Sequence, residues 1–206
     1  MDKLFYITIG RQLGSGGREI GERLAAGLGI NCYDKKLIEI ASLKSGLTES
    51  ILEKADEKRK NPLLGGYFEL SSTLLNNYAN NRLSSEMIFS VQSEVIRSLA
   101  AGESCLFVGR CADYVLRDQK SLLNIFITAD REQRIERVSS KEVIPLKKAS
   151  EIIDKSDKER ASYYNYFTSK KWGATSSYHL SVSSSLLGIE GTASFLTAFA
   201  KKYFEL

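Results

Sequence analysis

Short apolar runs alternate with longer amphipathic stretches along this chain of 206 residues. The short runs are rich in β-branched and aromatic side chains, which is typical of buried strands. In the longer stretches apolar residues recur every three or four positions, as they do on one face of a helix. The pattern predicts strands at residues 4–9, 31–33, 105–108, 122–128 and 180–183. It predicts helices after the first strand, where Ile20, Leu24 and Leu28 share one face, and at 34–43, 48–58, 67–82, 84–100, 130–139, 146–167 and 189–203.

The alternation of strands and helices predicts an α/β fold with one parallel five-stranded sheet and helices on both faces. The chain is long enough for one domain with a full core, and we expect a single domain over residues 1–206. In such folds ligands bind outside the carboxyl ends of the strands. The residues that follow each strand are therefore the first candidates for a functional site.

The turn after the first strand is rich in glycine. It contains Gly14, Ser15, Gly16 and Gly17, and Arg18 follows just inside the next helix. Because glycine has no Cβ, the backbone N–H groups of such a turn can converge on a ligand. The helix that follows adds its unpaired N–H groups and the positive end of its dipole. The turn therefore indicates a phosphate site, to which Arg18 adds a cation.

This turn differs from two common glycine motifs. It lacks the Gly-Lys pair of the Walker pattern G-x-x-x-x-G-K-[ST], and Glu19 occupies the last glycine position of the dinucleotide pattern G-x-G-x-x-G. The turn alone therefore indicates phosphate without specifying a nucleotide. A tight turn that only packs the helix against the strand is the alternative interpretation.

Charged residues also follow the third predicted strand. Arg110 and Asp113 come directly after it, and together they could clamp a substrate, with the arginine on a phosphate and the carboxylate on an amine or hydroxyl. The alternative is a helix start with a solvated arginine.

Two further sets of charges lie on predicted helices. Arg131, Arg134 and Arg137 recur every three residues, and Asp157 and Arg160 share one helix face. Cationic helices that fold over bound phosphates suit phosphoryl transfer, in which charge spreads over the oxygens of the transferred group. The alternatives are a solvated helix face and an intrahelical salt bridge. The dense aromatic segment 163–172 could pack a lid, line a base pocket or belong to the core.

Composition narrows the class of protein. The net charge of +4 suits small anionic ligands and is too small for a nucleic-acid footprint. We find no apolar run of about 18 residues that could span a membrane, and no signal-peptide core near the N-terminus. The three cysteines lack C-x-x-C spacing, which favours reduced thiols in a cytoplasmic protein. The single histidine, His179, argues against a histidine metal site or a Ser-His triad.

Five blocks of the sequence together resemble the cytidylate kinase-like branch of the nucleoside monophosphate kinases. They occur in the order typical of that family, at residues 14–19, 33–35, 108–113, 157–164 and 183–191. The resemblance implies a P-loop kinase-like three-layer sandwich with a helical lid. It also implies transfer of a phosphoryl group from ATP, with Mg²⁺, to a nucleoside monophosphate such as CMP or dCMP.

The resemblance also implies roles for the residues of the glycine turn. Gly14 and Gly16 match the glycines of the kinase phosphate loop, whereas Gly17 stands where the lysine is expected and Glu19 where the Mg²⁺-binding Ser or Thr is expected. Arg18 is then the substitute cation and Glu19 a candidate metal ligand. The residues expected to bind the ATP phosphates are Gly14, Ser15, Gly16, Gly17, Arg18 and Arg11.

The remaining roles concern the acceptor and the lid. Arg110 matches the arginine of the monophosphate site, and Cys111 replaces the aspartate that follows it in the kinases, so Asp113 is a candidate substitute. Asp157 is expected on the acceptor side as well. The resemblance places acceptor-side helices at 45–100 and a lid at 131–172. The expected catalytic cations are Arg18, Arg134, Arg137 and Arg160.

The sequence thus predicts an ATP-dependent nucleoside monophosphate kinase whose partners are small nucleotides, without nucleic acid or membrane. Two alternatives stay open. The altered loop favours a catalytically inactive nucleotide- or phosphate-binding regulatory protein, and a kinase for another small metabolite would use the same fold. The oligomeric state does not follow from the sequence.

Overall fold

The computed structural model describes residues 4–34 and 85–206. The chain divides into two compact units, Met1–Asp34 with Arg97–Leu206, and Lys35–Ile96. The sheet and the candidate site belong to the first unit. The helices predicted at 34–43, 48–58 and 67–82 lie outside the described residues, as does most of the region 45–100.

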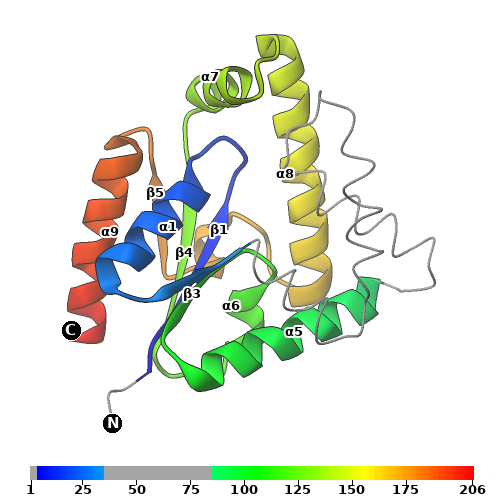
Figure 1. Cartoon of the computed structure of the whole chain (residues 1–206). Coiled ribbons are helices and arrows are strands. Elements are labelled where there is room, and N and C mark those ends of the chain that lie inside the picture. The colour runs from blue at the N-terminus through cyan, green and yellow to red at the C-terminus, as the bar shows by residue number, and fades with distance from the viewer. Residues whose placement is uncertain (1–3, 35–84) are drawn as a thin grey trace. The chain divides into compact units, whose positions relative to one another are not determined.

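The described residues form one parallel sheet of five strands in the order β2-β3-β1-β4-β5 (Figure 1). The predicted fold class is therefore confirmed. The first strand begins later than predicted and continues further, because Gly10 and Arg11 still pair with β4. The strands are β1 (Tyr6–Arg11), β2 (Asn31–Tyr33), β3 (Cys105–Val108), β4 (Leu122–Thr128) and β5 (Leu180–Ser183).

Within residues 4–34 and 85–206 the helices follow the predicted pattern closely. The helix predicted at 130–139 runs further, to Glu142, and ends where Val143 adopts a left-handed conformation with φ 53°. A short helix that the pattern did not predict follows β3. The helices are α1 (Gly17–Leu28), α5 (Ser85–Gly102), α6 (Ala112–Val115), α7 (Arg131–Glu142), α8 (Leu146–Thr168) and α9 (Gly188–Phe204), with a 3-10 turn at Thr175–Ser177.

Helices α1 and α9 cover one face of the sheet and bury its main apolar core (Figure 1). Strand residues such as Ile9 and Ile125 pack there against Leu24 of α1 and Leu196 of α9, and all four are almost fully buried. The alternation of the strands thus supplies one apolar face for these two helices.

The other face of the sheet is covered by aromatic side chains from the C-terminal half of α8 and the segment after it. Phe126 of β4 contacts Tyr178 at 4.9 Å and Trp172 at 5.1 Å between ring centroids, and Tyr164 stacks on Tyr178 at 6.0 Å. Tyr166, by contrast, is 65% exposed. Among the aromatic residues of the segment 163–172, only Tyr164 is buried, and Tyr163, Phe167 and Trp172 are half-buried. The core interpretation, one of the three that its sequence allowed, therefore holds for Tyr164.

Strand order places the topological switch point of the sheet at the end of β1. This strand lies between β3 and β4, so the chain reaches its two neighbours from opposite sides. At such a switch point the loops that follow the strands diverge and leave room for a ligand. The glycine turn follows β1 there, and α7 lies beyond the same ends of the strands (Figure 1). In the part of the chain that the structure describes, no helix is long and apolar enough to cross a membrane.

Gly14 in the glycine turn and Gly29 at the end of α1 separate two reasons for glycine, a left-handed backbone and a lack of space. Gly14 has φ 78°, and a Cβ on it would lie 2.6 Å from the carbonyl oxygen of Arg134. Gly29 has φ 68°, and a Cβ on it would meet nothing within 4 Å. We expect Gly29→Ala to lower the free energy of unfolding by about 1–3 kcal/mol, the cost of the left-handed backbone alone. Gly14→Ala should cost clearly more, because the collision with α7 is added. Urea unfolding measures both, and equal losses would contradict this packing.

Candidate functional site

The glycine loop is closed by its own hydrogen bonds and by β5. Ser15 is fully buried; its Oγ donates to the Gln12 carbonyl at 2.8 Å and accepts from the Gly17 N–H at 3.3 Å. Ser184, just after β5, donates to the Ser15 carbonyl at 2.7 Å. Gly14 and Gly16 adopt φ 78° and 75°, and α1 begins directly afterwards. The loop therefore presents the first turn of α1, with its unpaired N–H groups, at the switch point.

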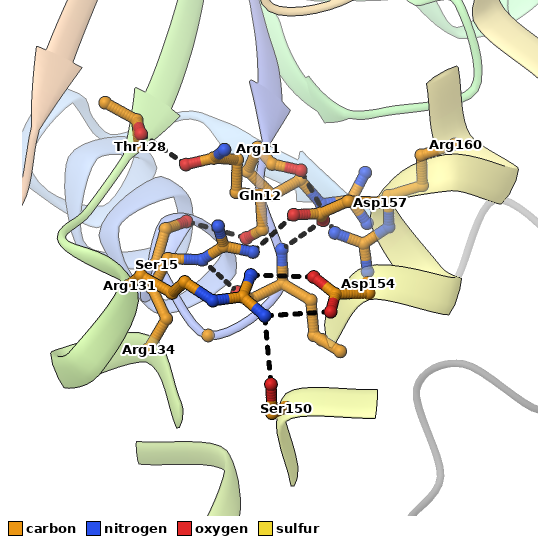
Figure 2. A network of polar contacts seen from close by, with 12 residues as sticks. Arg11, Gln12, Ser15, Thr128, Arg131, Arg134, Ser150, Asp154, Asp157 and Arg160 are labelled. Atoms are coloured by element: carbon orange, nitrogen blue, oxygen red, sulfur yellow. Dashed lines mark hydrogen bonds and ion pairs between the residues drawn. The ribbon is translucent and has the colours of Figure 1, made fainter. Parts of the chain in front are cut away.

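Helices α7 and α8 hold the loop through its backbone (Figure 2). The Arg134 Nε donates to the Leu13 carbonyl at 2.7 Å, and Asp157 Oδ1 accepts from the Leu13 N–H at 2.8 Å. Arg134 and Asp157 also pair with each other, with side chains only 6% and 16% exposed. We call these two residues the Leu13 bracket, because they bind both polar groups of the Leu13 backbone.

Two more arginines bind backbone carbonyls of the same segment. Arg137 donates to the Gly14 carbonyl, and the Nη1 of Arg160 donates to the Arg11 carbonyl at 3.0 Å. Three predicted site residues of α7 and α8, Arg134, Arg137 and Arg160, thus come together on the backbone between the end of β1 and the glycine loop.

The third arginine of the α7 row behaves differently. Arg131 forms a bidentate pair with Asp154 at 2.7 and 2.8 Å and contacts Ser150, and the arginine and aspartate side chains are 48% and 58% exposed (Figure 2). The solvated-face interpretation holds for this pair. It has the same spacing as the Leu13 bracket and lies on the same two helices.

A second group of charges lies at the ends of β1, β2 and β3. Asp34, directly after β2, lies 3.3 Å from the Nε of Arg18 and 3.8 Å from the Nη2 of Arg11. Arg18 also pairs with Glu22 at 2.9 Å. Sequence reasoning did not name Asp34 as a site residue, although its place directly after a strand was a signal. Sequence reasoning also missed Ser184. Its partner is the backbone carbonyl of Ser15, and a contact with the backbone leaves no pattern of residue types in the sequence.

The arginines of this region depress each other's affinity for protons. Burial lowers the pKa of Arg160 to about 9, and the charge of Arg11 lowers it as well. Burial also lowers the pKa of Arg11, where Asp34 opposes the effect and Arg110 and Arg18 add to it. Positive charges that disfavour each other in this way are stabilised by an anion placed among them. The region is therefore electrostatically suited to phosphate.

Arg110 reaches this region from an unusual turn. Gly109, Arg110 and Cys111 have φ 80°, 60° and 54°, three left-handed residues in succession. Such a conformation costs about 1–3 kcal/mol at each residue other than glycine, and it is concentrated at functional sites in proteins.

Asp113 and Cys111 do not join the arginines as direct partners. Asp113 is 6% exposed and accepts a hydrogen bond from the Tyr164 hydroxyl at 2.6 Å. Burial raises its pKa, and the bond from Tyr164 opposes the rise. Burial raises the pKa of the Cys111 thiol to about 12, so this buried thiol stays protonated.

Glu19, the candidate metal ligand, is exposed and pairs with Arg23 one turn further along α1 at 3.0 Å. Within residues 4–34 and 85–206 there is no group of three or more His, Cys, Asp or Glu side chains placed to hold a metal ion. The metal role of Glu19 stays a prediction.

Comparison with known structures supports the fold. An uncharacterized protein from Eubacterium ventriosum ATCC 27560 is 28% identical, with a TM-score of 0.73 over 97% of this chain and 99% of that chain. Shikimate kinase from Bacteroides thetaiotaomicron is 11% identical, with a TM-score of 0.55 over 99% of this chain and 100% of that chain. Shikimate kinase from Acinetobacter baumannii in complex with shikimate is 14% identical, with a TM-score of 0.50 over 99% and 93%.

These similarities show that the chain has the fold of P-loop kinases. Comparison with curated proteins gave no match. The sequence profile of the cytidylate kinase-like family matches residues 6–186, which is most of the chain. The glycine loop and all the arginines described above lie within that match, and the protein belongs to the cytidylate kinase-like family.

Proposed function

We propose that the protein transfers a phosphoryl group from ATP to a nucleoside monophosphate of the CMP or dCMP type. The observation that carries this proposal is the group of four arginines, Arg11, Arg18, Arg110 and Arg160, beside the glycine loop. The kinase-like family and the P-loop kinase fold support a phosphotransferase. The monophosphate acceptor is our inference from the charge of the site.

The donor phosphates fit the glycine loop. The N-terminus of α1 supplies N–H groups and a positive dipole, and Arg18 supplies charge on the first turn. ATP brings the phosphoryl group that is transferred, and these residues hold and orient its phosphates. The magnesium ion that accompanies ATP in such kinases is part of the proposal, but we assign it no step, because Glu19 pairs with Arg23 on the outer side of α1.

We assign the acceptor phosphate to Arg110. The left-handed turn after β3 carries this residue. Burial lowers the pKa of Arg11 and of Arg160, and the positive charge of Arg110 lowers both further. Since an acceptor phosphate is already an anion, it needs no side-chain base to become a nucleophile. Arg137 and Arg160 then stabilise the charge that spreads over the transferred group.

The Leu13 bracket has a different task. Arg134 and Asp157 are largely buried and bound to the backbone of Leu13, so we assign them to positioning the loop. In this proposal they take roles other than those expected from the sequence, which placed Arg134 on the phosphoryl group and Asp157 on the acceptor. Asp113, bound to Tyr164, supports the turn that carries Arg110. Residues 131–172, with α7 and α8, form the lid that excludes water from the phosphates.

We place the protein in the cytoplasm, where Cys32, Cys105 and Cys111, all free in the structure, would stay reduced. Its partners in this proposal are small nucleotides. A second function, phosphate binding without turnover, is favoured by Gly17 and Glu19, which occupy the positions of the expected lysine and Ser or Thr. The two functions differ in one measurable property, the release of ADP.

ADP release from ATP and Mg²⁺ should therefore be measured across a panel of nucleoside monophosphates, with shikimate included as a phosphate-free acceptor. We expect turnover with CMP or dCMP, and a loss of about 100-fold or more in kcat/KM for Arg110→Ala, because a charged hydrogen-bonding partner of the acceptor is removed. Arg18→Ala should raise the KM for ATP.

Arg117→Ala is the matched control for this panel, because Arg117 is exposed and contacts its own turn, where it donates to the Tyr114 carbonyl and lies over the Tyr114 ring. ATP binding without ADP release on any acceptor would favour the second function. Turnover on shikimate alone would favour a kinase whose acceptor is a hydroxyl group on a molecule without phosphate.

The positioning role of Asp157 can be tested against Asp154. Asp157→Asn should lower the free energy of unfolding by about 1.5–3 kcal/mol, because it weakens hydrogen bonds made by a buried charged group. Asp154→Asn removes the same charge from the exposed pair with the same spacing and should leave stability unchanged. Urea unfolding of the two variants decides the matter; equal stabilities would show that the bracket does not hold the loop.

Phosphate binding should also depend on pH. A bound phosphate favours the charged form of Arg160, so binding is strongest below the pKa of about 9 and weakens as the pH rises through it. The dissociation constant for ATP, measured by calorimetry between pH 7.5 and 10.5, should rise by up to about tenfold per pH unit above 9. In Arg160→Gln the Arg160 contribution to this rise should disappear. An identical profile in both proteins would exclude Arg160 from the phosphate site.

A further inference from the structure

The side chain of Arg11 fills the space that a side chain on Gly17 would need. A Cβ on Gly17 would lie 2.6 Å from the Cβ of Arg11, 3.1 Å from its Cγ, and 3.2 Å from the Cβ of Ile127. Carbon atoms do not approach to 2.6 Å without displacing one another. Gly17 has ordinary backbone angles, so the need for glycine arises from this contact. The residue at 17 is therefore coupled to the residue at 11.

The other end of Arg11 reaches the turn after β3. A Cβ on Gly109 would overlap its Nη1 and lie 3.2 Å from its Cζ. The side chain of Arg11 thus runs from the start of α1 to the end of β3 and is 19% exposed. Two glycines, Gly17 and Gly109, leave room for its two ends.

The charge of Arg11 lies among the other cations of the site. Arg11 and Arg110 both lower the pKa of Arg160, while Arg18 and Arg110 lower that of Arg11. Its Nη2 lies 3.8 Å from Asp34, which is too long for a hydrogen bond. The Nε of Arg18, by comparison, lies 2.9 Å from Glu22 and 3.3 Å from Asp34. Arg18 is thus bound more closely by carboxylates than Arg11 is.

We propose that Arg11 is the cation that binds the transferable phosphates of the donor in place of the lysine expected at position 17, and that Gly17 is glycine because Arg11 crosses it. This inference rests on the proposed function and deepens it. It moves the main donor cation from α1 to the last residue of β1. A guanidinium there can bind two phosphate oxygens at once through two N–H groups, whereas a lysine ammonium acts as a point charge.

The proposal makes the exchange of the two residues testable. The probes are ATP and inorganic triphosphate, with dissociation constants from calorimetry and folding checked by thermal unfolding. Arg11→Gln should weaken both by about 10- to 100-fold, the effect of losing a charged hydrogen-bond donor. Gly17→Lys alone should be strongly destabilised by the collision with Arg11. The double variant Arg11→Gly with Gly17→Lys should fold and bind within a few-fold of the native protein.

Arg117→Gln, which removes an exposed arginine, should leave binding unchanged. Arg11→Lys provides a second variant in case Arg11→Gln does not fold, and it should retain most of the affinity because it keeps the charge. If the native protein binds neither probe, the proposed function fails. If the native protein binds and a folded Arg11→Gln binds equally well, while Arg18→Gln does not, the inference about Arg11 is overturned and Arg18 is the donor cation. A folded double variant that fails to bind would contradict it as well.

Discussion

The structure of the site depends on how the backbone of the glycine loop is held. Arg134 and Asp157 bind the carbonyl and the N–H of Leu13, and neither group is left for water. A loop that presents N–H groups to phosphate must keep its carbonyls turned away, because they would repel the anion. Arg137 occupies the carbonyl of Gly14, and Arg160 occupies that of Arg11, at the end of β1 just before the loop. The helices that form the proposed lid therefore also set the shape of the proposed phosphate site.

In this account, closure of the proposed lid is coupled to the loop. Arginines that bind loop carbonyls lie close to the position at which phosphates would bind, so a small change of side-chain conformation could bring Arg137 or Arg160 onto the ligand. The buried Arg134 is less free to move, since its partner Asp157 is itself bound to the loop. The row of arginines on α7 thus contains three kinds of residue. Arg131 is exposed to solvent, Arg134 is bound to the backbone of the loop, and Arg137 is the one that the proposal assigns to the ligand.

Much of the fold could be predicted from the sequence, because strand and helix periodicity are local. The strands at 31–33, 105–108, 122–128 and 180–183 were predicted with the observed bounds. The site was predicted only in part. The glycine loop and its arginines were found from spacing, but roles that depend on distant partners were not. Asp34, the Leu13 bracket and the contact between Arg11 and Gly17 join segments that only tertiary packing brings together.

The central claim is that the arginines beside the glycine loop bind the phosphates of two substrates. A crystal structure with a non-hydrolysable ATP analogue and CMP tests it most directly. The account predicts donor phosphates on the N-terminus of α1 with Arg11 in contact, and the acceptor phosphate on Arg110. Phosphates bound elsewhere, or a site that stays empty at saturating concentrations of both ligands, would contradict the account.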